Sequence, residues 1–320
     1  MARTRRSPID RKRARRRRDP APRPACSLYE EVTAKIISEL EAGRLPWVQP
    51  WDSRGLGPAL PHNAVTRRSY SGINVLLLWG GLVERGFATQ AWLTFRQAQA
   101  AGGSVRKGER GTSIVFADRF TPEAEAQRAR ACGTEPRSIP FLKRFTVFNV
   151  DQCDGLPPDF TVVTTPLPER ETVPAAEALI AASGADFRIG GARAFYVPAL
   201  DYVQVPPQPA FRAQIDYYRT ALHELGHWTG HPSRLGRDLG HAFGTQGYAR
   251  EELCAELASA FLCAALGIRP TVRHADYIGS WLEVLRSDNR AVFQAARNAS
   301  RAADFLLAFR GEAQATECAA

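Results

Sequence analysis

The amino-acid sequence predicts an α+β protein made of two unlike halves. Short β-branched and aromatic runs at residues 113–116 and 145–150 predict paired strands in the first half. Apolar residues at helical spacing over residues 249–266 and in two later segments predict a mostly helical second half. Between the halves, residues 156–174 carry five prolines and several threonines, which is typical of a linker. We therefore expect a mixed α/β N-terminal half and a C-terminal half of helices with a small β-sheet.

These features divide the 320 residues into four expected segments. They are an arginine-rich tail at residues 1–25, an N-terminal domain at 26–156, a linker at 157–174 and a C-terminal domain at 175–312. Residues 1–24 hold 11 Lys and Arg against 2 acids, so the tail accounts for the whole net charge of +9. Its low apolar content predicts a disordered arm, which either binds nucleic acid loosely or only aids solubility.

The predicted elements of the first half follow from apolar spacing, β-branched runs and glycine or proline breaks. In chain order they are a helix at residues 28–40, an extended aromatic loop at 45–51, a helical turn at 75–79, a helix at 92–99, a basic turn at 104–111, a strand at 113–116, a polar insertion at 121–140 and a strand at 145–150. Glycines at 43, 86 and 102 close the helical segments. We expect the two strands to pair with each other.

The second half begins with a short helix and strands and then becomes helical. Its expected elements are a helix at residues 175–182, a hairpin of 187–189 with 194–197, a strand at 202–205, a helix that starts near 208–213 and stops at 230–232, a helix at 249–266, and helices at 275–286 and 288–309. We expect the helix at 249–266 to lie against the one before it.

The stretch His223-Glu224-Leu225-Gly226-His227 reads H-E-x-x-H within the first long helix of this half. Residues four apart share a helix face, so both imidazoles can converge on one cation while Glu224 reaches a water molecule beside it. Chance is a weak explanation, because a chain with so few histidines would contain the pattern roughly once in a hundred cases. The pattern predicts a zinc hydrolase site with His223 and His227 as ligands and Glu224 as catalytic base.

A catalytic zinc site takes three protein ligands, so a third donor has to come from elsewhere in the chain. Glu252 and Glu256 share one face of the helix at 249–266. We expect Glu252 to be the third ligand and Glu256 to orient a histidine, and the reverse assignment stays open. His231 is a competing ligand, but the helix ends beside it and position 233 is serine where a longer metal-binding motif has histidine. We therefore expect His231 at the rim of the site.

Two further residues, His241 and Tyr248, are candidates for stabilising an oxyanion or lining the rim. With one zinc ion per chain, or another divalent metal in its place, a water molecule would lose a proton to Glu224 and attack a polarised carbonyl group. Amide hydrolysis is the expected reaction. The strands before the motif helix could hold an extended peptide by its backbone, a binding mode that does not identify the protein substrate.

Single-stranded nucleic acid is bound by basic grooves that also offer aromatic faces for base stacking. The loops and turns of the first half supply candidates of both kinds. They are Trp47, Trp51, Arg67, Arg68, Tyr70, Arg96, Arg106 and Lys107. The turn that carries Arg106 and Lys107 can present them to phosphates without burial, whereas Trp47 and Trp51 are as consistent with core packing as with stacking.

Six cysteines are scattered along the chain without C-x-x-C spacing, so neither a disulfide framework nor a cysteine-rich zinc site is expected. No apolar segment follows the N-terminal arginines, so they do not form a signal peptide. The sequence also has no run of about 18 apolar residues that would predict a membrane span. We expect a cytoplasmic protein with reduced thiols.

Several longer stretches resemble ArdC-type antirestriction proteins. Residues 223–231 and 248–257 resemble their zincin-like domain. The first half resembles their N-terminal single-stranded-DNA-binding domain in the motifs Leu45-Pro46-Trp47, Ser71-Gly72-Ile73-Asn74, Trp92-Leu93-Thr94-Phe95-Arg96-Gln97-Ala98, Val105-Arg106-Lys107-Gly108-Glu109 and Val147-Phe148-Asn149-Val150. The resemblance spans about residues 26–310.

The resemblance implies a bacterial mobile-element protein that binds single-stranded DNA and protects incoming DNA from host restriction, with a gluzincin-type metallopeptidase domain attached. A component of the restriction system is one candidate for its protein substrate, and the protein could enter a recipient cell with the DNA. Two rival hypotheses stay open. One is a DNA-binding shield with a structural or vestigial metal centre, and the other is an effector peptidase whose DNA affinity is incidental.

Overall fold

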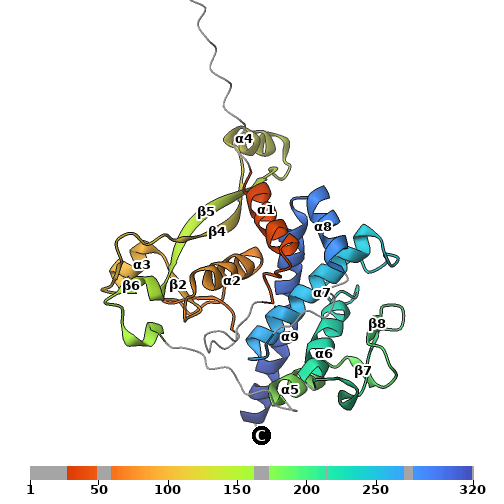
Figure 1. Ribbon diagram of the computed structural model, residues 1–320. Helices are drawn as coiled ribbons and strands as arrows, with labels where there is room; N and C mark the ends of the chain where they lie inside the picture. Colours follow the sequence, from red (N-terminus) through yellow and green to blue (C-terminus); the bar gives the residue numbers. More distant parts are fainter. Residues whose placement is uncertain (1–26, 49–58, 162–172, 214, 270–276, 319–320) are drawn as a thin grey trace, which may run out of the picture.

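A computed structural model describes residues 27–48, 59–161, 173–213, 215–269 and 277–318 (Figure 1). The arginine-rich tail, Trp51 and most of the expected linker lie outside the described residues. The helices are α1 (Leu28–Glu41), α2 (Ile73–Arg85), α3 (Phe95–Ala100), α4 (Glu123–Cys132), α5 (Pro174–Ala182), α6 (Ile215–Trp228), α7 (Gln246–Ala265), α8 (Ile278–Ser287) and α9 (Ala291–Cys318). The strands are β1 (His62–Asn63), β2 (Ala91–Leu93), β3 (Ser104–Val105), β4 (Thr112–Phe120), β5 (Ile139–Asn149), β6 (Cys153–Asp154), β7 (Asp186–Ile189), β8 (Phe195–Val197) and β9 (Tyr202–Val205). This content confirms the α+β class.

The first half is built on a sheet with the strand order β1-β2-β5-β4. The expected strand pairing is confirmed, since β4 and β5 are antiparallel from Thr112↔Val147 to Phe120↔Ile139. The expected polar insertion at 121–140 contains α4, which connects the two strands at the tip of the ribbon, and β5 already begins at Ile139 (Figure 1). Near the other end of β4, α2 packs against the sheet.

The expected helix at 92–99 begins later than the apolar spacing suggested. Trp92 belongs to β2, where it pairs with Asn149 of β5. Thr94 then caps α3, because its side chain accepts a hydrogen bond from the backbone N–H of Gln97. A buried strand that runs directly into a capped helix places apolar residues three apart, and this spacing imitates a single helix.

The sheet of the second half has the order β7-β9-β8. The expected hairpin of 187–189 with 194–197 is wrong, because β9 lies between these strands and pairs with β7 in parallel and with β8 antiparallel. Strand β8 is therefore an edge strand. The motif helix α6 begins at Ile215, after a 3-10 turn at Gln208–Ala210, and so starts later than expected.

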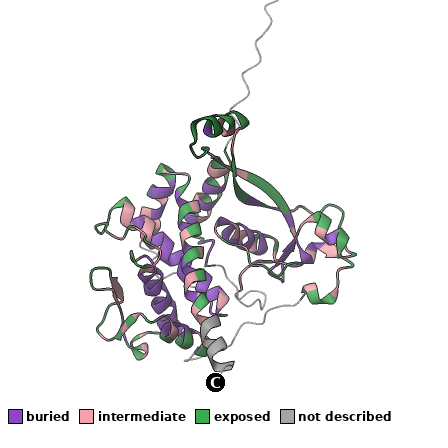
Figure 2. Ribbon diagram, turned by 180° about the vertical axis from the view of Figure 1, so that it is seen from behind, coloured by how far each residue is buried: buried purple, intermediate pink, exposed green. Residues whose placement is uncertain are grey.

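The two halves share one hydrophobic core. Helix α7 is central to the helical half, where α6, α8 and α9 pack against it, and Figure 2 shows α6 and α7 as mostly buried. Two aromatic contacts join this half to the first. The ring centres of Trp79 in α2 and Phe261 in α7 are 5.8 Å apart, and those of Trp47 and Trp281 in α8 are 5.6 Å apart. The domain boundaries at 156 and 175 stay predictions, but the parts they separate are packed against each other through buried side chains.

Cys132, Cys153, Cys254 and Cys263 are free thiols, and burial raises the pKa of the last two to about 12. Burial therefore keeps these two thiols protonated and unreactive near neutral pH. None of the described helices is long and apolar enough to cross a lipid bilayer.

We predict that Phe261→Ala destabilises both halves together. Phe261 is 1% exposed and packs edge-to-face on Trp79, so its truncation leaves a cavity in the shared core and costs about 3–5 kcal/mol. Urea unfolding, followed by circular dichroism and tryptophan fluorescence, should show one transition at a lower midpoint. Phe243→Ala is the control, because Phe243 is 80% exposed and its loss should change stability by less than about 0.5 kcal/mol. Two separate transitions, with only one of them shifted, would contradict a shared core.

Candidate metal centre

Helices α6 and α7 lie side by side and supply the side chains of the predicted metal site. Small residues allow the close approach: a Cβ atom on Gly226 would lie 3.4 Å from the Cβ of Ala258 and 3.5 Å from the Cα of Ala255. Nothing larger than a methyl group fits there. The Ser259 hydroxyl also donates a 3.0 Å hydrogen bond to the backbone carbonyl of Arg219, which fixes the two helices along their axes. This packing positions the carboxylates of α7 opposite the imidazoles of α6.

Three donor atoms from these helices face one point. The Nε2 atoms of His223 and His227 are 3.2 Å apart. One carboxylate oxygen of Glu252 lies 3.5 Å from Nε2 of His223, and the other lies 3.5 Å from Nε2 of His227. Four-coordinate zinc with bonds of about 2.1 Å has ligand atoms about 3.4 Å apart, so these spacings are of the size found between the ligands of one zinc ion. Within the described residues, these three form the group that could hold a metal ion. The donor set therefore fits a divalent cation, with one coordination position left for water or substrate.

The remaining carboxylates of α7 contact the other nitrogen atoms of the imidazoles. An oxygen of Glu256 lies 3.6 Å from Nδ1 of His223, on the side away from Glu252. An oxygen of Glu251 lies 3.1 Å from Nδ1 of His227. The structure thus brings Glu252, rather than Glu256, to the side where the two Nε2 atoms meet. Each imidazole is oriented by a carboxylate behind it, the arrangement that fixes ring orientation in metal sites.

Glu251 is a site residue that the sequence reasoning missed. It is held in place by Arg237, whose Nη2 and Nε atoms donate hydrogen bonds of 2.8 and 3.0 Å to its two oxygens. The sequence feature that could have predicted this role is the pair Glu251-Glu252. Neighbouring residues on a helix point about 100° apart, so the two carboxylates can face different histidines. Arg237 comes from the loop after the motif helix, and its direction could not be read from the sequence.

The carboxylates change the protonation of the histidines. Burial lowers the pKa of His223, but its contacts with Glu252 and Glu256 outweigh burial and raise the pKa to about 10. Contacts with Glu251 and Glu252 likewise overcome burial and raise the pKa of His227 to about 9. Burial raises the pKa of Glu251 and Glu252, yet the histidines lower it below the ordinary value. The carboxylates therefore keep both imidazoles protonated near neutral pH, in the positions where a divalent cation would replace those protons.

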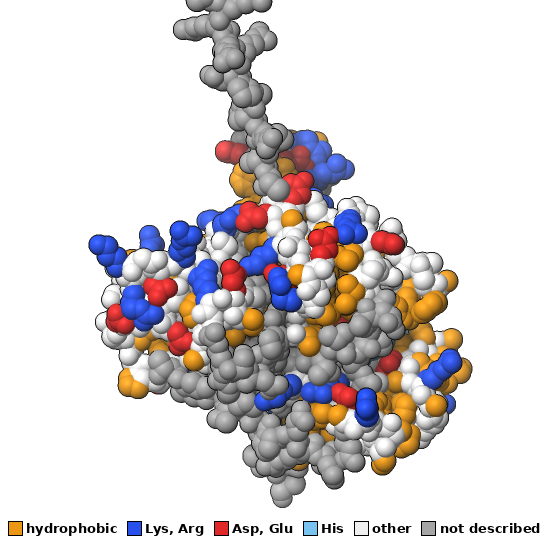
Figure 3. Space-filling view, in the orientation of Figure 1, with side chains coloured by type: hydrophobic (Ala, Val, Ile, Leu, Met, Phe, Trp, Pro, Cys, Tyr) orange, Lys and Arg blue, Asp and Glu red, His pale blue; other side chains and the backbone are white. Residues whose placement is uncertain are grey.

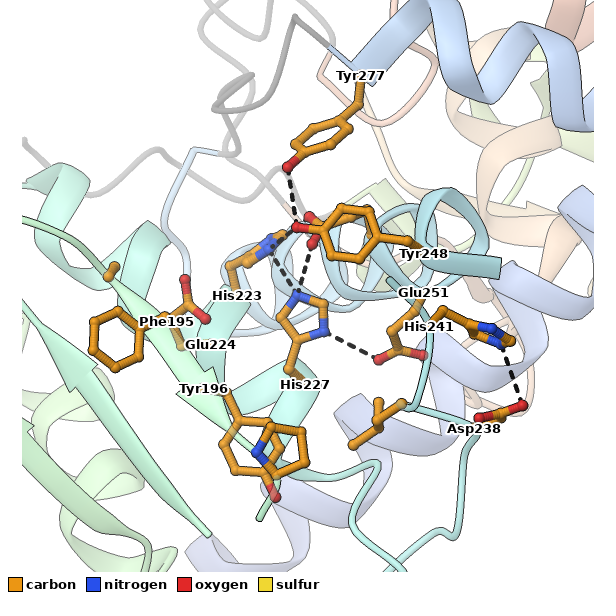
Figure 4. Close-up of a pocket in the computed structure, with 14 residues that line it drawn as sticks. Phe195, Tyr196, His223, Glu224, His227, Asp238, His241, Tyr248, Glu251 and Tyr277 are labelled. Carbon is orange, nitrogen blue, oxygen red and sulfur yellow. Dashed lines mark hydrogen bonds and ion pairs between the residues drawn. The ribbon is translucent and has the colours of Figure 1, made fainter. Parts of the chain in front are cut away.

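A cavity of about 310 Å³ opens over the three donors (Figure 4). It is lined by Ala194, Phe195, Tyr196, Pro198, His223, Glu224, His227, Asp238, Leu239, His241, Tyr248, Glu251, Glu252 and Tyr277. Glu224 lies on its wall beside Phe195 of the edge strand β8 (Figure 4). The cavity thus combines the metal donors, a carboxylate that is not one of the three donors, and the outer strand of the β7-β9-β8 sheet.

The predicted rim residues fall in different places. Tyr248 lines the cavity, and its hydroxyl lies 3.1 Å from that of Tyr277. Burial, Tyr277 and Glu252 all raise the pKa of Tyr248, so its hydroxyl keeps its proton. His241 also lines the cavity and lies 3.2 Å from a carboxylate oxygen of Asp238. His231 is not at the rim, because its ring bonds the hydroxyl of Ser233 at 2.7 Å and is not part of the cavity lining.

Of the three aromatic candidates for DNA binding, the structure corrects Trp47. Trp47 is fully buried against Trp281, so it offers no face to a base and serves the core instead. Trp51 lies outside the described residues. Tyr70 is half-buried and packs against the core, and burial raises its pKa. The sequence left core packing and base stacking equally open for Trp47, and its contact with Trp281 of α8 decides for the core.

The basic candidates gather at one end of the molecule, near α3 and β6, where Figure 3 shows several Lys and Arg side chains. Arg68, Arg96 and Lys107 are exposed there. Arg67 is exposed but donates a hydrogen bond to the carbonyl of Asp159, and Arg106 pairs with Glu109 and Asp154. The first three are thus better placed to contact phosphates, whereas Arg106 also holds its own turn together.

We predict that Glu251→Gln weakens metal binding while the fold survives. The substitution removes the charge that orients His227, and losing such a partner costs about 10–100-fold in metal affinity. Titration with Zn²⁺ or Mn²⁺ against a chromophoric chelator measures the effect, and circular dichroism checks the fold. Glu283→Gln, at an exposed position of α8, is the matched control and should bind like the wild type. Equal metal affinity in the wild type and both variants would show that Glu251 does not position His227.

We also predict that metal binding releases protons near neutral pH. Both imidazoles must be neutral to bind a metal, and their pKa values of about 9 and about 10 lie above 7, so the cation displaces protons. Apparent affinity should therefore rise as pH increases from about 6 to about 9. Calorimetric titration with Mn²⁺ in two buffers of different ionisation enthalpy counts the released protons. Heats that do not depend on the buffer would contradict this account.

Comparison with known proteins identifies the family. Residues 27–148 match the family model described as the N-terminal domain of anti-restriction factor ArdC, and residues 174–298 match the zincin-like metallopeptidase model. Protein y4eC of Sinorhizobium fredii (strain NBRC 101917 / NGR234) is 42% identical over 305 residues, which cover 93% of this chain and 97% of y4eC. A DNA primase TraC of Escherichia coli is 42% identical over 298 residues, which cover 88% of this chain but only 27% of TraC.

Solved structures agree with these matches. The metal-free crystal structure of the antirestriction protein ArdC from plasmid R388 superposes with a TM-score of 0.76 at 40% identity, over 89% of this chain and 98% of that one. Its Mn(II)-bound structure gives a TM-score of 0.73 at 39% identity, over 88% and 98% of the two chains. A divalent metal is thus found in this fold, in agreement with the donor set described above. The chain belongs to the ArdC-type family of antirestriction proteins.

Proposed function

We propose that this protein protects the DNA of a mobile element by two activities. Its N-terminal half, at about residues 26–156, binds single-stranded DNA, and its C-terminal half, at about 175–312, hydrolyses peptide bonds at a zinc centre. The observation that carries the hydrolase proposal is the convergence of three donor residues beneath a cavity that Glu224 also lines: the two Nε2 atoms are 3.2 Å apart, and each lies 3.5 Å from a carboxylate oxygen of Glu252. The protein would act in the bacterial cytoplasm, and its substrate would be a protein such as a component of the restriction system.

Zinc is the proposed cofactor because two imidazoles and one carboxylate are a donor set of catalytic zinc sites. His223, His227 and Glu252 would hold it. The relative whose structure contains Mn(II) supports a site that also accepts other divalent metals. Bound zinc would polarise the carbonyl group of the substrate and make water acidic enough to be deprotonated at neutral pH.

The residues of the chain supply the remaining chemistry. Glu224 accepts a proton from the attacking water and returns it to the leaving nitrogen, as a general base and then a general acid. The Tyr248 hydroxyl keeps its proton and can donate a hydrogen bond to the oxyanion that develops on the substrate. The edge strand β8 holds the substrate backbone by strand pairing, which selects for extended chain rather than for particular side chains.

The DNA-binding proposal rests on the match of residues 27–148 to the N-terminal ArdC domain and on the exposed basic residues near α3. Arg68, Arg96 and Lys107 would contact phosphate groups, and such contacts give binding that weakens with salt. Arg67 and Arg106 would support the turns that present them. No base-specific contact is needed for protection of DNA of any sequence.

Replacement of Glu224 tests the hydrolase proposal. Glu224→Gln keeps the size of the side chain but cannot accept the proton, so the variant should bind Zn²⁺ normally and cleave fluorescein-labelled casein about 100-fold more slowly or worse. Protection is measured in parallel, as transfer of an unmodified plasmid into a restricting host. Protection should fall together with cleavage.

Glu283→Gln again serves as the matched control, and it should retain both cleavage and protection. If Glu224→Gln protects the plasmid as well as the wild type does, hydrolysis is not the basis of protection. The protein is then a DNA-binding shield, and its metal centre is structural or vestigial. Cleavage that persists in Glu224→Gln would instead remove Glu224 from the mechanism.

A further inference from the structure

The β4–β5 ribbon exposes a row of large apolar side chains. Exposed fractions are 54% for Phe116, 59% for Phe120, 39% for Phe141, 40% for Phe145 and 56% for Ile139. The base of the same ribbon is buried in the core at Ile114 and Val147, so the exposed apolar residues belong to its outer part. Clustered apolar exposure of this kind marks binding surfaces in soluble proteins.

Strand register places these side chains on one face, which we name the ribbon face. Directly opposed residues of antiparallel strands share a face, and so does every second pair along the ladder. The pairs on the ribbon face are Thr112↔Val147, Ile114↔Phe145, Phe116↔Lys143, Asp118↔Phe141 and Phe120↔Ile139. Four phenylalanines therefore lie on a single surface, and Lys143 and Asp118 are the charged residues among the ten.

The ribbon face combines aromatic rings with a cation. Phe116 and Phe145 pack edge-to-face with ring centres 6.1 Å apart, so the rings do not cover each other face-to-face. The Lys143 ammonium lies 5.2 Å from the ring centre of Phe145. Aromatic faces next to a positive charge are the combination that holds single-stranded nucleic acid, since bases stack on the rings and phosphates pair with the cation.

The base of the ribbon is fixed before any ligand binds. The side chain of Asn74 on α2 bonds both backbone groups of Val115, with its Nδ2 donating to the carbonyl at 2.8 Å and its Oδ1 accepting from the N–H at 2.9 Å. Arg144 pairs with Glu31 of α1 on the other face of the ribbon. These contacts bond the backbone of β4 at this point and anchor the ribbon. The ribbon therefore loses little conformational freedom when a flexible strand of DNA binds.

Charge and continuity favour DNA over a protein partner. Residues 112–149 carry six Lys and Arg against four Asp and Glu. At the base of the ribbon, on the face of β5 opposite Phe145, Phe148 contacts Phe95 of α3 with ring centres 6.4 Å apart, and Arg96 follows directly. The base of the ribbon therefore lies next to the basic end near α3.

We propose that the ribbon face is a base-stacking platform for single-stranded DNA, with Phe116 and Phe145 stacking on bases and Lys143 pairing with a phosphate. This inference rests on the proposed DNA binding of the N-terminal half and assigns the stacking role that Trp47 does not fill. Bases in a duplex are paired and stacked on each other, so the platform selects unpaired strands.

The test is fluorescence anisotropy with a fluorescein-labelled oligothymidylate over a series of salt concentrations. Phe116→Ser/Phe145→Ser should weaken binding at least about tenfold without changing the slope of affinity against salt, because stacking releases no counterions. Lys143→Gln should reduce that slope by about 0.7, the value of one phosphate contact on a single strand. Ile189→Ser is the matched control, because Ile189 is 63% exposed on β7 of the other sheet, and it should bind like the wild type.

Phe145→Trp supplies a direct signature of stacking. The variant should bind the oligonucleotide as the wild type does, and its added fluorescence should be quenched by the strand and not by a matched duplex. Zn²⁺ binding by every variant checks that the fold survives. A variant that fails this check is replaced by Phe116→Leu/Phe145→Leu, which keeps apolar contacts but offers no ring.

The outcomes separate this inference from the proposed function. If the wild type binds the strand and the phenylalanine variants bind equally well, the ribbon platform is overturned and DNA binding stands. If the wild type does not bind the strand, both fall. Variants that lose only self-association, measured by analytical ultracentrifugation, would assign the ribbon face to a second copy of the chain and overturn the platform.

Discussion

Helix α6 contributes both histidines of the metal centre and helix α7 contributes its carboxylates, so the separation of these two helices decides whether a cation can be held. Gly226 and the alanines opposite it set that separation, because a larger side chain there would move Glu252 away from the two Nε2 atoms. The rest of the centre follows from this contact. Once the helices are close, Glu251 and Glu256 reach the outer nitrogens of the histidines, and each imidazole is held between carboxylates.

The helix pair is part of a larger body that includes the first half of the molecule. Helix α7 packs against α6 on one side and presents Phe261 to Trp79 of α2. The metal centre and the basic end near α3 are therefore supported by the same core. Any DNA bound by the first half is held at a fixed distance from the cavity, and a protein attached to that DNA would meet the cavity in a limited range of orientations.

The sequence predicted the parts of this structure that depend on local spacing. H-E-x-x-H on a helix and the glutamates of the next helix follow from the period of 3.6 residues, and these side chains do meet. The strand pair β4–β5 was also predictable from its β-branched runs. Tertiary contacts determine the other features. Trp47 is buried in the core, β9 lies between β7 and β8, and Arg237 donates hydrogen bonds to Glu251. None of these is encoded by spacing along one element.

The aromatic contacts between the halves also limit how the protein can be taken apart. A fragment ending near residue 156 would contain Trp79 but lack its contact Phe261. A fragment starting near residue 174 would contain Trp281 but lack its contact Trp47. Both fragments would expose tryptophan-rich surfaces to water and would be prone to aggregate. Recombination between relatives is under the same restriction, since exchanging one half alone would join two surfaces that had not been selected to fit.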